Sequence, residues 1–292
     1  MEKMNSKENI KIDFVGIGAV KSGTTWIAEC LEEHPQISLP RKDQEKSAFF
    51  LRFPLTEKDI YYFEKLFPSP SKLKGDFHVA YLQNPKTAEK IKKHNPEIKI
   101  IVCLRNPVKM AWSQFRFLKF LKNRKWDNLR EAVREEPAII EYGFHQKYLQ
   151  KYFDLFSREN ILVLIYEDIE KDPLRFIQNI YSFLGVDPFF SPPSIHKKVN
   201  LTNFKMSWLG RLLHKGLIKP LLKHSSWAWK AKKSPFLKKI IFSFSEFYSS
   251  KGKFNSSLSE NDCQWLMKIY KKDIEELENL INRNLKEWKK IC

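Results

Sequence analysis

Three stretches of the chain are almost continuously apolar, which is typical of strands covered on both faces of a parallel sheet. They are residues 12–19 (IDFVGIGA), 98–104 (IKIIVCL) and 161–165 (ILVLI). After each of them apolar residues recur at helical spacing, in 24–34, from Pro107 onward and in 173–184, where Gly185 is the expected stop. Strands that alternate with helices three times predict an α/β fold, with a central parallel sheet flanked by helices.

The hydrophobic pattern changes in the last third of the chain. Between Phe189 and Phe254 the period is lost and Lys, Trp, Phe and Ser dominate, so we expect helical pieces and loops laid over the domain at about 190–257. Residues 260–288 regain an amphipathic pattern and predict one terminal helix, about 258–290. We therefore expect a single domain over residues 1–292, with its core at about 10–188 and in the terminal helix.

Composition narrows the class of protein. The 292 residues include 52 Lys and Arg against 34 Asp and Glu, a net charge of +18. Such a charge favours polyanions, acidic lipid surfaces or phosphorylated small molecules as partners, although solvated lysines explain it equally well. Four separated cysteines without a C-x-x-C pair imply neither a disulfide framework nor a zinc site. The N-terminus is charged, and no stretch approaches the ~20 apolar residues of a membrane span, so we expect a cytoplasmic protein.

The loop after the first strand carries the first chemical motif, Lys21-Ser22-Gly23-Thr24-Thr25-Trp26. Backbone N–H groups at a helix N-terminus lack partners, and the helix dipole adds positive potential. Lys21 adds a full charge, Gly23 allows close approach, and three hydroxyls are further donors. The loop therefore predicts a site for a phosphate-like anion, with a capped helix and an incidental lysine as the alternative. It lacks the Gly-Lys-Ser/Thr order of nucleotide triphosphatases.

Two further motifs follow this loop along the chain. Arg105 ends a predicted strand and Ser113 follows eight residues later, while Tyr166-Glu167-Asp168 opens a third motif that closes on Phe183-Leu184-Gly185. In this order the three motifs resemble the family of sulfotransferases that use 3′-phosphoadenosine 5′-phosphosulfate (PAPS), and Lys21–Trp26 resembles the family's 5′-phosphosulfate loop. Residues 266–288 resemble the terminal helix of bacterial carbohydrate-type members. The resemblance implies a fold like that of P-loop nucleotide triphosphatases, with a helical and loop cover over the acceptor site at about 190–257.

The resemblance also implies the nucleotide contacts. The 5′-phosphosulfate would be bound by Lys21, Ser22, Gly23, Thr24, Thr25 and Trp26. Arg105 and Ser113 would bind the 3′-phosphate, for which a planar guanidinium is well suited, whereas a sheet-edge salt bridge and a surface serine are the alternatives. Tyr166 matches a position near the adenine, with core packing as the alternative. Lys251, Gly252 and Lys253 resemble a basic loop that closes over the nucleotide, with a charged surface turn as the alternative.

The general base that takes the proton of the acceptor has two candidates. Carbohydrate-type members of the family place a glutamate a few residues before a Phe-Phe pair, and here Glu45 precedes Phe49-Phe50 one residue out of register. His78 matches the position where cytosolic-type members place their histidine base, and an ordinary histidine pKa suits that role. We expect both side chains to line the acceptor site, with His78 the better base, although either could be a substrate contact and His78 could be structural.

The sequence therefore predicts a bacterial, cytoplasmic sulfotransferase that uses PAPS, releases adenosine 3′,5′-bisphosphate and needs no metal. In an in-line displacement Lys21 would stabilise the leaving phosphate. The acceptor would be a carbohydrate or a small molecule of secondary metabolism, and no nucleic-acid partner is expected. The rival hypothesis is a non-catalytic basic module that binds polyanions. Against it, we expect the positive charge to be dispersed, and no nucleic-acid motif is found.

Overall fold

The computed structural model describes residues 11–40, 48–52, 54, 56–67, 72–121, 124–196 and 257–290. The strands are β1 (Phe14–Gly18), β2 (Ile37–Ser38), β3 (Leu73–Phe77), β4 (Lys99–Leu104) and β5 (Ile161–Ile165). The first helices are α1 (Thr24–Glu33), α2 (Phe49–Arg52), α3 (Glu57–Glu64), α4 (Thr87–His94), α5 (Pro107–Leu121), α6 (Leu129–Glu135) and α7 (Ala138–Glu141). They are followed by α8 (His145–Leu155), the short η1 (Arg158–Asn160), α9 (Glu167–Lys171), α10 (Pro173–Leu184), α15 (Glu260–Ile281) and α16 (Lys286–Lys289).

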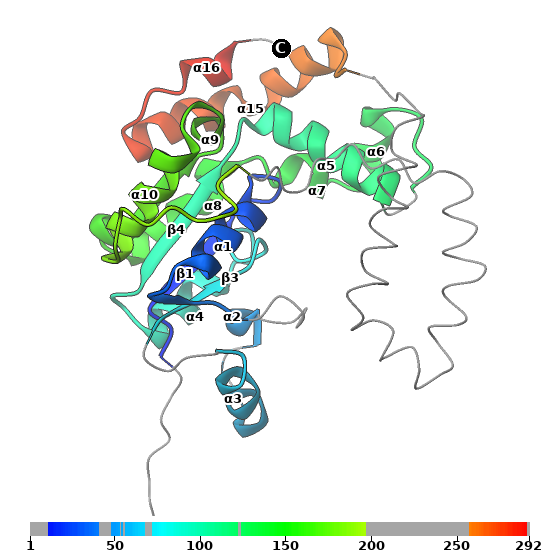
Figure 1. Ribbon diagram of the computed structural model, residues 1–292. Helices are drawn as coiled ribbons and strands as arrows, with labels where there is room; N and C mark the ends of the chain where they lie inside the picture. The colour runs from blue at the N-terminus through cyan, green and yellow to red at the C-terminus, as the bar shows by residue number, and fades with distance from the viewer. Residues whose placement is uncertain are drawn as a thin grey trace, which may run out of the picture. The chain divides into compact units, whose positions relative to one another are not determined.

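The five strands form one sheet in the order β2-β3-β1-β4-β5, and every pair in it is parallel. Figure 1 shows β1 and β4 side by side in this sheet, where Val15 pairs with Ile100. The chain leaves β1 toward β2 on one side and leaves β4 toward β5 on the other. Ligands of open α/β sheets bind where such connections diverge, at the carboxyl ends of the strands. The topology thus places the switch point at the ends of β1 and β4, where a ligand is expected, and it confirms the predicted parallel sheet.

Alternation along β4 explains why the sheet is covered on both faces. Ile101 and Cys103 join a buried cluster with Phe14 of β1 and the inner faces of α1 and α10. The intervening residues Ile100 and Val102 point to the opposite face and are equally buried. On the described part of the chain, α8 packs against both α4 and α15 (Figure 1). The continuous apolar run of β4 therefore reflects two hydrophobic layers around one sheet.

Helix ends agree with the predictions except at the C-terminus. The helix α10 begins at Pro173, capped by Asp172, and ends before Gly185, which has φ 79°. The terminal helix was predicted to be continuous over 258–290, and this is wrong: α15 ends at Ile281 and α16 begins at Lys286. Asn282 has φ 50°, a left-handed conformation that asparagine tolerates better than most residues and that ends a helix.

Two compact units divide the chain. One comprises Met1–Phe115, Trp126–Asn200 and Glu260–Cys292, and the other comprises Arg116–Lys125 and Leu201–Ser259. The sheet belongs to the first unit. The cover predicted at about 190–257 lies mostly outside the described residues, so both that cover and the single-domain organisation stay predictions.

The cysteines differ in state. Cys30 and Cys103 are buried and form no disulfide, as expected of small core residues, whereas Cys263 is disulfide-bonded, which the sequence analysis did not predict. Within the described ranges, none of the helices combines the length and hydropathy that a membrane crossing requires.

Candidate active site

The loop between β1 and α1 has an unusual backbone. Lys21 has φ 60° and Gly23 has φ 76°, so two of its residues are left-handed. Gly23 is the N-cap of α1, but no side chain caps this helix and its first turn carries no acidic residue. The first N–H groups of α1 are therefore directed outward without a side-chain acceptor, in the field of the helix dipole. This arrangement favours an anion, and the assignment of the loop to a phosphate-like group stays a prediction.

Arg105 lies beside this loop, at the end of β4. Its Nη1 donates to the carbonyl oxygen of Lys21 at 3.0 Å, and its guanidinium lies 4.4 Å from the centre of the Tyr166 ring. Its Nε is buried and has no hydrogen-bond partner. A buried N–H group without an acceptor is costly unless a ligand accepts from it, so the Nε of this half-buried side chain fits an anionic group.

Lys21 and Arg105 bring two positive charges to one place. Burial lowers the pKa of the Lys21 ammonium below its usual 10.5, and the neighbouring Arg105 guanidinium lowers it further. Both effects disfavour the charged lysine. An anion bound between the two cations would reverse the second effect, because it would stabilise the ammonium form.

Three other residues of the predicted nucleotide site use their side chains within the protein. Ser22 is fully buried and its hydroxyl donates to the Val20 carbonyl at 3.3 Å. Trp26 packs in the core cluster, and its indole N–H donates to the Ser194 carbonyl at 3.1 Å. Tyr166 packs at the edge of the same cluster, as the core-packing alternative had it, with its ring over Gly23. Ser22 and Trp26 therefore have only their backbone amides to offer a ligand.

Of the other residues predicted to bind the nucleotide or the acceptor, the structure describes some and not others. Thr24 is half-buried and Thr25 is exposed at the start of α1, and Ser113 is buried on α5. Lys251, Gly252 and Lys253 lie outside the described residues, and so does Glu45. Their assignment to the nucleotide and acceptor sites stays a prediction.

His78 follows β3, the strand on the other side of β1. Its Nδ1 accepts a hydrogen bond from the Ala80 N–H at 3.2 Å. In a neutral ring whose Nδ1 is an acceptor, the proton resides on Nε2. Burial lowers the pKa of His78 below 6.5, which favours this neutral form at neutral pH. His78 therefore offers a donor, Nε2–H, in the conformation that the structure shows.

A buried acid stands next to this histidine, and sequence reasoning missed it. Asp76 accepts from the Tyr81 hydroxyl and from the Phe49 N–H at 3.2 Å, while the Tyr81 oxygen accepts from the Phe50 N–H at 3.1 Å. Burial raises the pKa of Asp76 to about 7, although the hydrogen bonds from Tyr81 and from backbone N–H groups act against this. The pair thus holds the first two amides of α2, the helix that follows the segment containing Glu45.

His145 contacts the backbone of Arg105. It is fully buried at the start of α8, and its Nε2–H donates to the Arg105 carbonyl at 2.8 Å. Burial lowers the pKa of His145 to about 4, so the ring is neutral and its Nδ1 has no proton to donate. A single histidine at the first position of a helix carries no sequence signal for this role.

The chain is similar in sequence to known sulfotransferases. Sulfotransferase 1A1 of Bos taurus is 32% identical over 175 residues, which are 56% of this chain and 56% of that protein. Bifunctional heparan sulfate N-deacetylase/N-sulfotransferase 4 of Mus musculus is 23% identical over 198 residues, 61% of this chain but only 23% of that protein. The chain thus matches little more than half the length of these relatives, or less.

A solved structure extends the likeness to nearly every residue. The sulfotransferase from Alicyclobacillus acidocaldarius has a TM-score of 0.65 and 21% sequence identity, over 97% of this chain and 100% of that chain, and so it shares the fold. Residues 11–289 match the sulfotransferase domain, a span that includes β1, β4 and the loop between β1 and α1. The chain therefore belongs to the sulfotransferase domain family.

Proposed function

We propose that this protein transfers a sulfuryl group from PAPS to a hydroxyl or amine of a small-molecule or carbohydrate acceptor. The observation that carries this proposal is the position of Arg105, whose Nη1 bonds the Lys21 carbonyl and whose buried Nε has no partner. Two cations and an uncapped helix N-terminus meet there, at the carboxyl ends of β1 and β4. Family membership supports the same chemistry.

PAPS supplies the sulfuryl group and the bisphosphate that leaves. The Lys21 ammonium and the amides at the start of α1 would hold its 5′-phosphosulfate. When the bond between sulfur and the bridging oxygen breaks, negative charge develops on the leaving phosphate, where Lys21 would stabilise it. The contribution of Ser22 and Trp26 would come from their backbone amides, because their side chains are engaged within the protein.

Arg105 would bind the 3′-phosphate, with Ser113 as a second donor. The free Nε and the remaining guanidinium N–H groups can form charge-assisted hydrogen bonds to a phosphate dianion. This contact would distinguish PAPS from nucleotides that lack the 3′-phosphate. Tyr166 would hold the guanidinium plane rather than stack on the adenine, because its ring faces Arg105 and Gly23.

The acceptor atom forms the new bond to sulfur, and its proton passes to a base. We assign this role to His78 or Glu45, and the contact between His78 and Ala80 bears on the choice. With Nδ1 accepting from Ala80, Nε2 already carries a proton and cannot take another until the ring leaves this contact. His78 would then donate to the acceptor or to a sulfuryl oxygen, and Glu45 would be the base.

The class of acceptor is the least constrained part of the proposal. A relative named as a heparan sulfate N-sulfotransferase supports a carbohydrate amine, and a relative named Sulfotransferase 1A1 aligns over a similar share of the chain. A bacterial, cytoplasmic enzyme of secondary metabolism is the setting we propose. A panel of sugar, amine and phenol acceptors with labelled PAPS would separate these classes.

Calorimetry tests the nucleotide site directly. We expect adenosine 3′,5′-bisphosphate to bind much more tightly than 5′-AMP, and Arg105→Ala to remove the difference. Lys21→Ala should abolish turnover with any acceptor. Arg134→Ala is the matched control, because Arg134 is exposed on α6 and changes the net charge equally. Equal binding of the two nucleotides by the wild type would overturn the proposal, and polyanion binding would then favour the basic module.

A further inference from the structure

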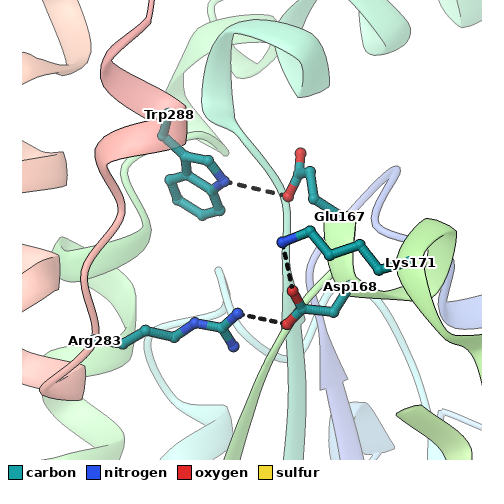
Figure 2. A network of polar contacts seen from close by, with 5 residues as sticks. All are labelled: Glu167, Asp168, Lys171, Arg283 and Trp288. Atoms are coloured by element: carbon teal, nitrogen blue, oxygen red, sulfur yellow. Dashed lines mark hydrogen bonds and ion pairs between the residues drawn. The ribbon is translucent and has the colours of Figure 1, made fainter. Parts of the chain in front are cut away.

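The chain's C-terminal segment is fastened to the ends of the two strands that carry Arg105 and Tyr166. Figure 2 shows Trp288 of α16 donating its indole N–H to Glu167, while Arg283 reaches the neighbouring Asp168. The first of these bonds measures 3.2 Å and joins positions 121 residues apart. Trp288 is only 2% exposed, so its indole N–H is removed from water and depends on this partner.

Asn106, the residue after Arg105, is held by the same two groups. Its N–H donates to Glu167 Oε1 at 3.2 Å, and its Nδ2 donates to the Trp288 carbonyl at 3.2 Å. Its Oδ1 accepts from the N–H groups of Val108 and Lys109, which caps α5. Every polar group of this buried side chain therefore has a partner, and two of its contacts lead to Trp288, directly or through Glu167.

Arg105 itself is fixed at its backbone as well as at its side chain. Its carbonyl accepts from His145, whose ring centre lies 5.9 Å from that of Trp288. His145 opens α8, and Asp273 of α15 accepts from the N–H groups of the next two residues at 3.2 and 3.3 Å. The C-terminal helices thus contact the support of Arg105 at two points.

We propose that Trp288 and Glu167 are positioning residues for Arg105. They fix the peptide that follows it, so that the guanidinium stays beside the Lys21 carbonyl with Nε free for the 3′-phosphate. This inference rests on the proposed function. Neither residue touches the nucleotide; each acts through Asn106. The backbone matters here because the side chain of Arg105 spans several rotatable bonds, and a displaced backbone would move its donors off a phosphate oxygen.

Two conservative variants test this role. Trp288→Phe keeps an aromatic ring but removes the indole N–H, and Glu167→Gln keeps the shape of the side chain but leaves one of its two bonded N–H groups without an acceptor. The readout is the ratio of the dissociation constants of 5′-AMP and adenosine 3′,5′-bisphosphate. We expect each variant to lower this ratio about tenfold, the equivalent of one charged hydrogen bond, with 5′-AMP affinity unchanged.

Arg283→Gln is the matched control. Arg283 joins the same C-terminal segment to the same strand end, since it pairs with Asp168 at 2.5 Å (Figure 2). Among the described residues, the hydrogen bonds of Asn106 go to Glu167, Trp288, Val108 and Lys109 and not to Arg283. It should leave the ratio unchanged. If Trp288→Phe and Glu167→Gln leave the ratio unchanged and only lower the melting temperature, the residues are structural and the inference fails. If the wild type itself does not distinguish the two nucleotides, the proposed function fails instead.

Discussion

At the scale of single residues, the hydrogen bond between Ala80 and His78 gives a test of what the histidine does. With a proton on Nε2, His78 acts as a donor, and a glutamine amide can donate from a similar position. We expect His78→Gln to keep much more of kcat/KM than His78→Ala does. Steady-state rates with one acceptor and saturating PAPS would measure both.

The pH profile separates the donor from the base. If His78 is the donor, the acidic limb of the profile of kcat belongs to another group and persists in His78→Gln. If His78→Gln is as inactive as His78→Ala and the acidic limb disappears, the histidine is the base after all. Glu45→Gln provides the complementary variant.

Lys21 gives a second prediction at this scale. Burial, and then Arg105, lower the pKa of the Lys21 ammonium below 10.5, and a bound phosphate would favour the charged form again. Binding of adenosine 3′,5′-bisphosphate should therefore take up protons at alkaline pH below 10.5. Calorimetry in two buffers of different ionisation enthalpy measures this uptake. The uptake should vanish in Lys21→Arg, and a buffer-independent heat for the wild type would contradict it.

At the scale of elements, two glycines with the same backbone conformation form a matched pair. Gly23 has φ 76° and Gly185 has φ 79°, but an added Cβ meets the Tyr166 ring at 3.0 Å in the first and only a lysine nitrogen at 3.8 Å in the second. Alanine at either position costs about 1 kcal/mol from its left-handed conformation. We expect both variants to lower the free energy of unfolding.

Only Gly23→Ala should also weaken nucleotide binding, because the added methyl group displaces Tyr166 and, through it, the guanidinium of Arg105. Urea unfolding and calorimetry with adenosine 3′,5′-bisphosphate would measure the two effects separately. If Gly185→Ala weakens binding as much as Gly23→Ala does, the effect comes from general instability and not from the loop.

What the sequence could predict depends on how local the signal is. β1, β4 and β5 are apolar runs and were predicted, whereas β2 has two residues and β3 (LKGDF) is too polar and glycine-containing for the pattern to reveal. The left-handed turn at Asn282 is carried by one residue inside an otherwise helical pattern. The support of Arg105 by Trp288, Glu167 and His145 rests on contacts between distant positions, and no spacing rule reveals these.

At the scale of the whole molecule, the net charge is less evenly spread than the sequence analysis assumed. Residues 197–256 hold 14 of the 52 basic side chains and one of the 34 acidic ones, so +13 of the +18 falls in these 60 positions. The rest of the chain, which includes the sheet and the Lys21 loop, carries +5. The expectation of dispersed charge is therefore wrong. A segment with this charge can bind any polyanion in a salt-dependent way. Selectivity between nucleotides is therefore a better test of function than salt-dependent binding.

Buried carboxylates make global stability depend on pH with a definite sign. Burial raises the pKa of Asp76 to about 7 and that of Asp273 to about 6, so the folded protein holds these protons more tightly than the unfolded chain does. The stabilisation that these two protonated carboxyl groups add to the free energy of unfolding is complete below about pH 4. It is lost as the pH rises through 6 and 7. His145, with its pKa lowered to about 4, acts in the opposite direction between pH 4 and 6.5.

Asp76→Asn isolates one side of this balance. In the wild type, ionisation of Asp76 lowers the stability as the pH rises from about 4 to 7. Asparagine cannot ionise, so this decrease is absent from the variant. We expect the wild type to exceed the variant in stability by most near pH 4 and by least near pH 8, with the difference in the free energy of unfolding changing by a few kcal/mol at most across this range. Thermal unfolding of both proteins across this range measures the difference. A constant difference would mean that Asp76 is ionised in the folded protein throughout, held by Tyr81 and the amides of α2, and would place the pH dependence elsewhere.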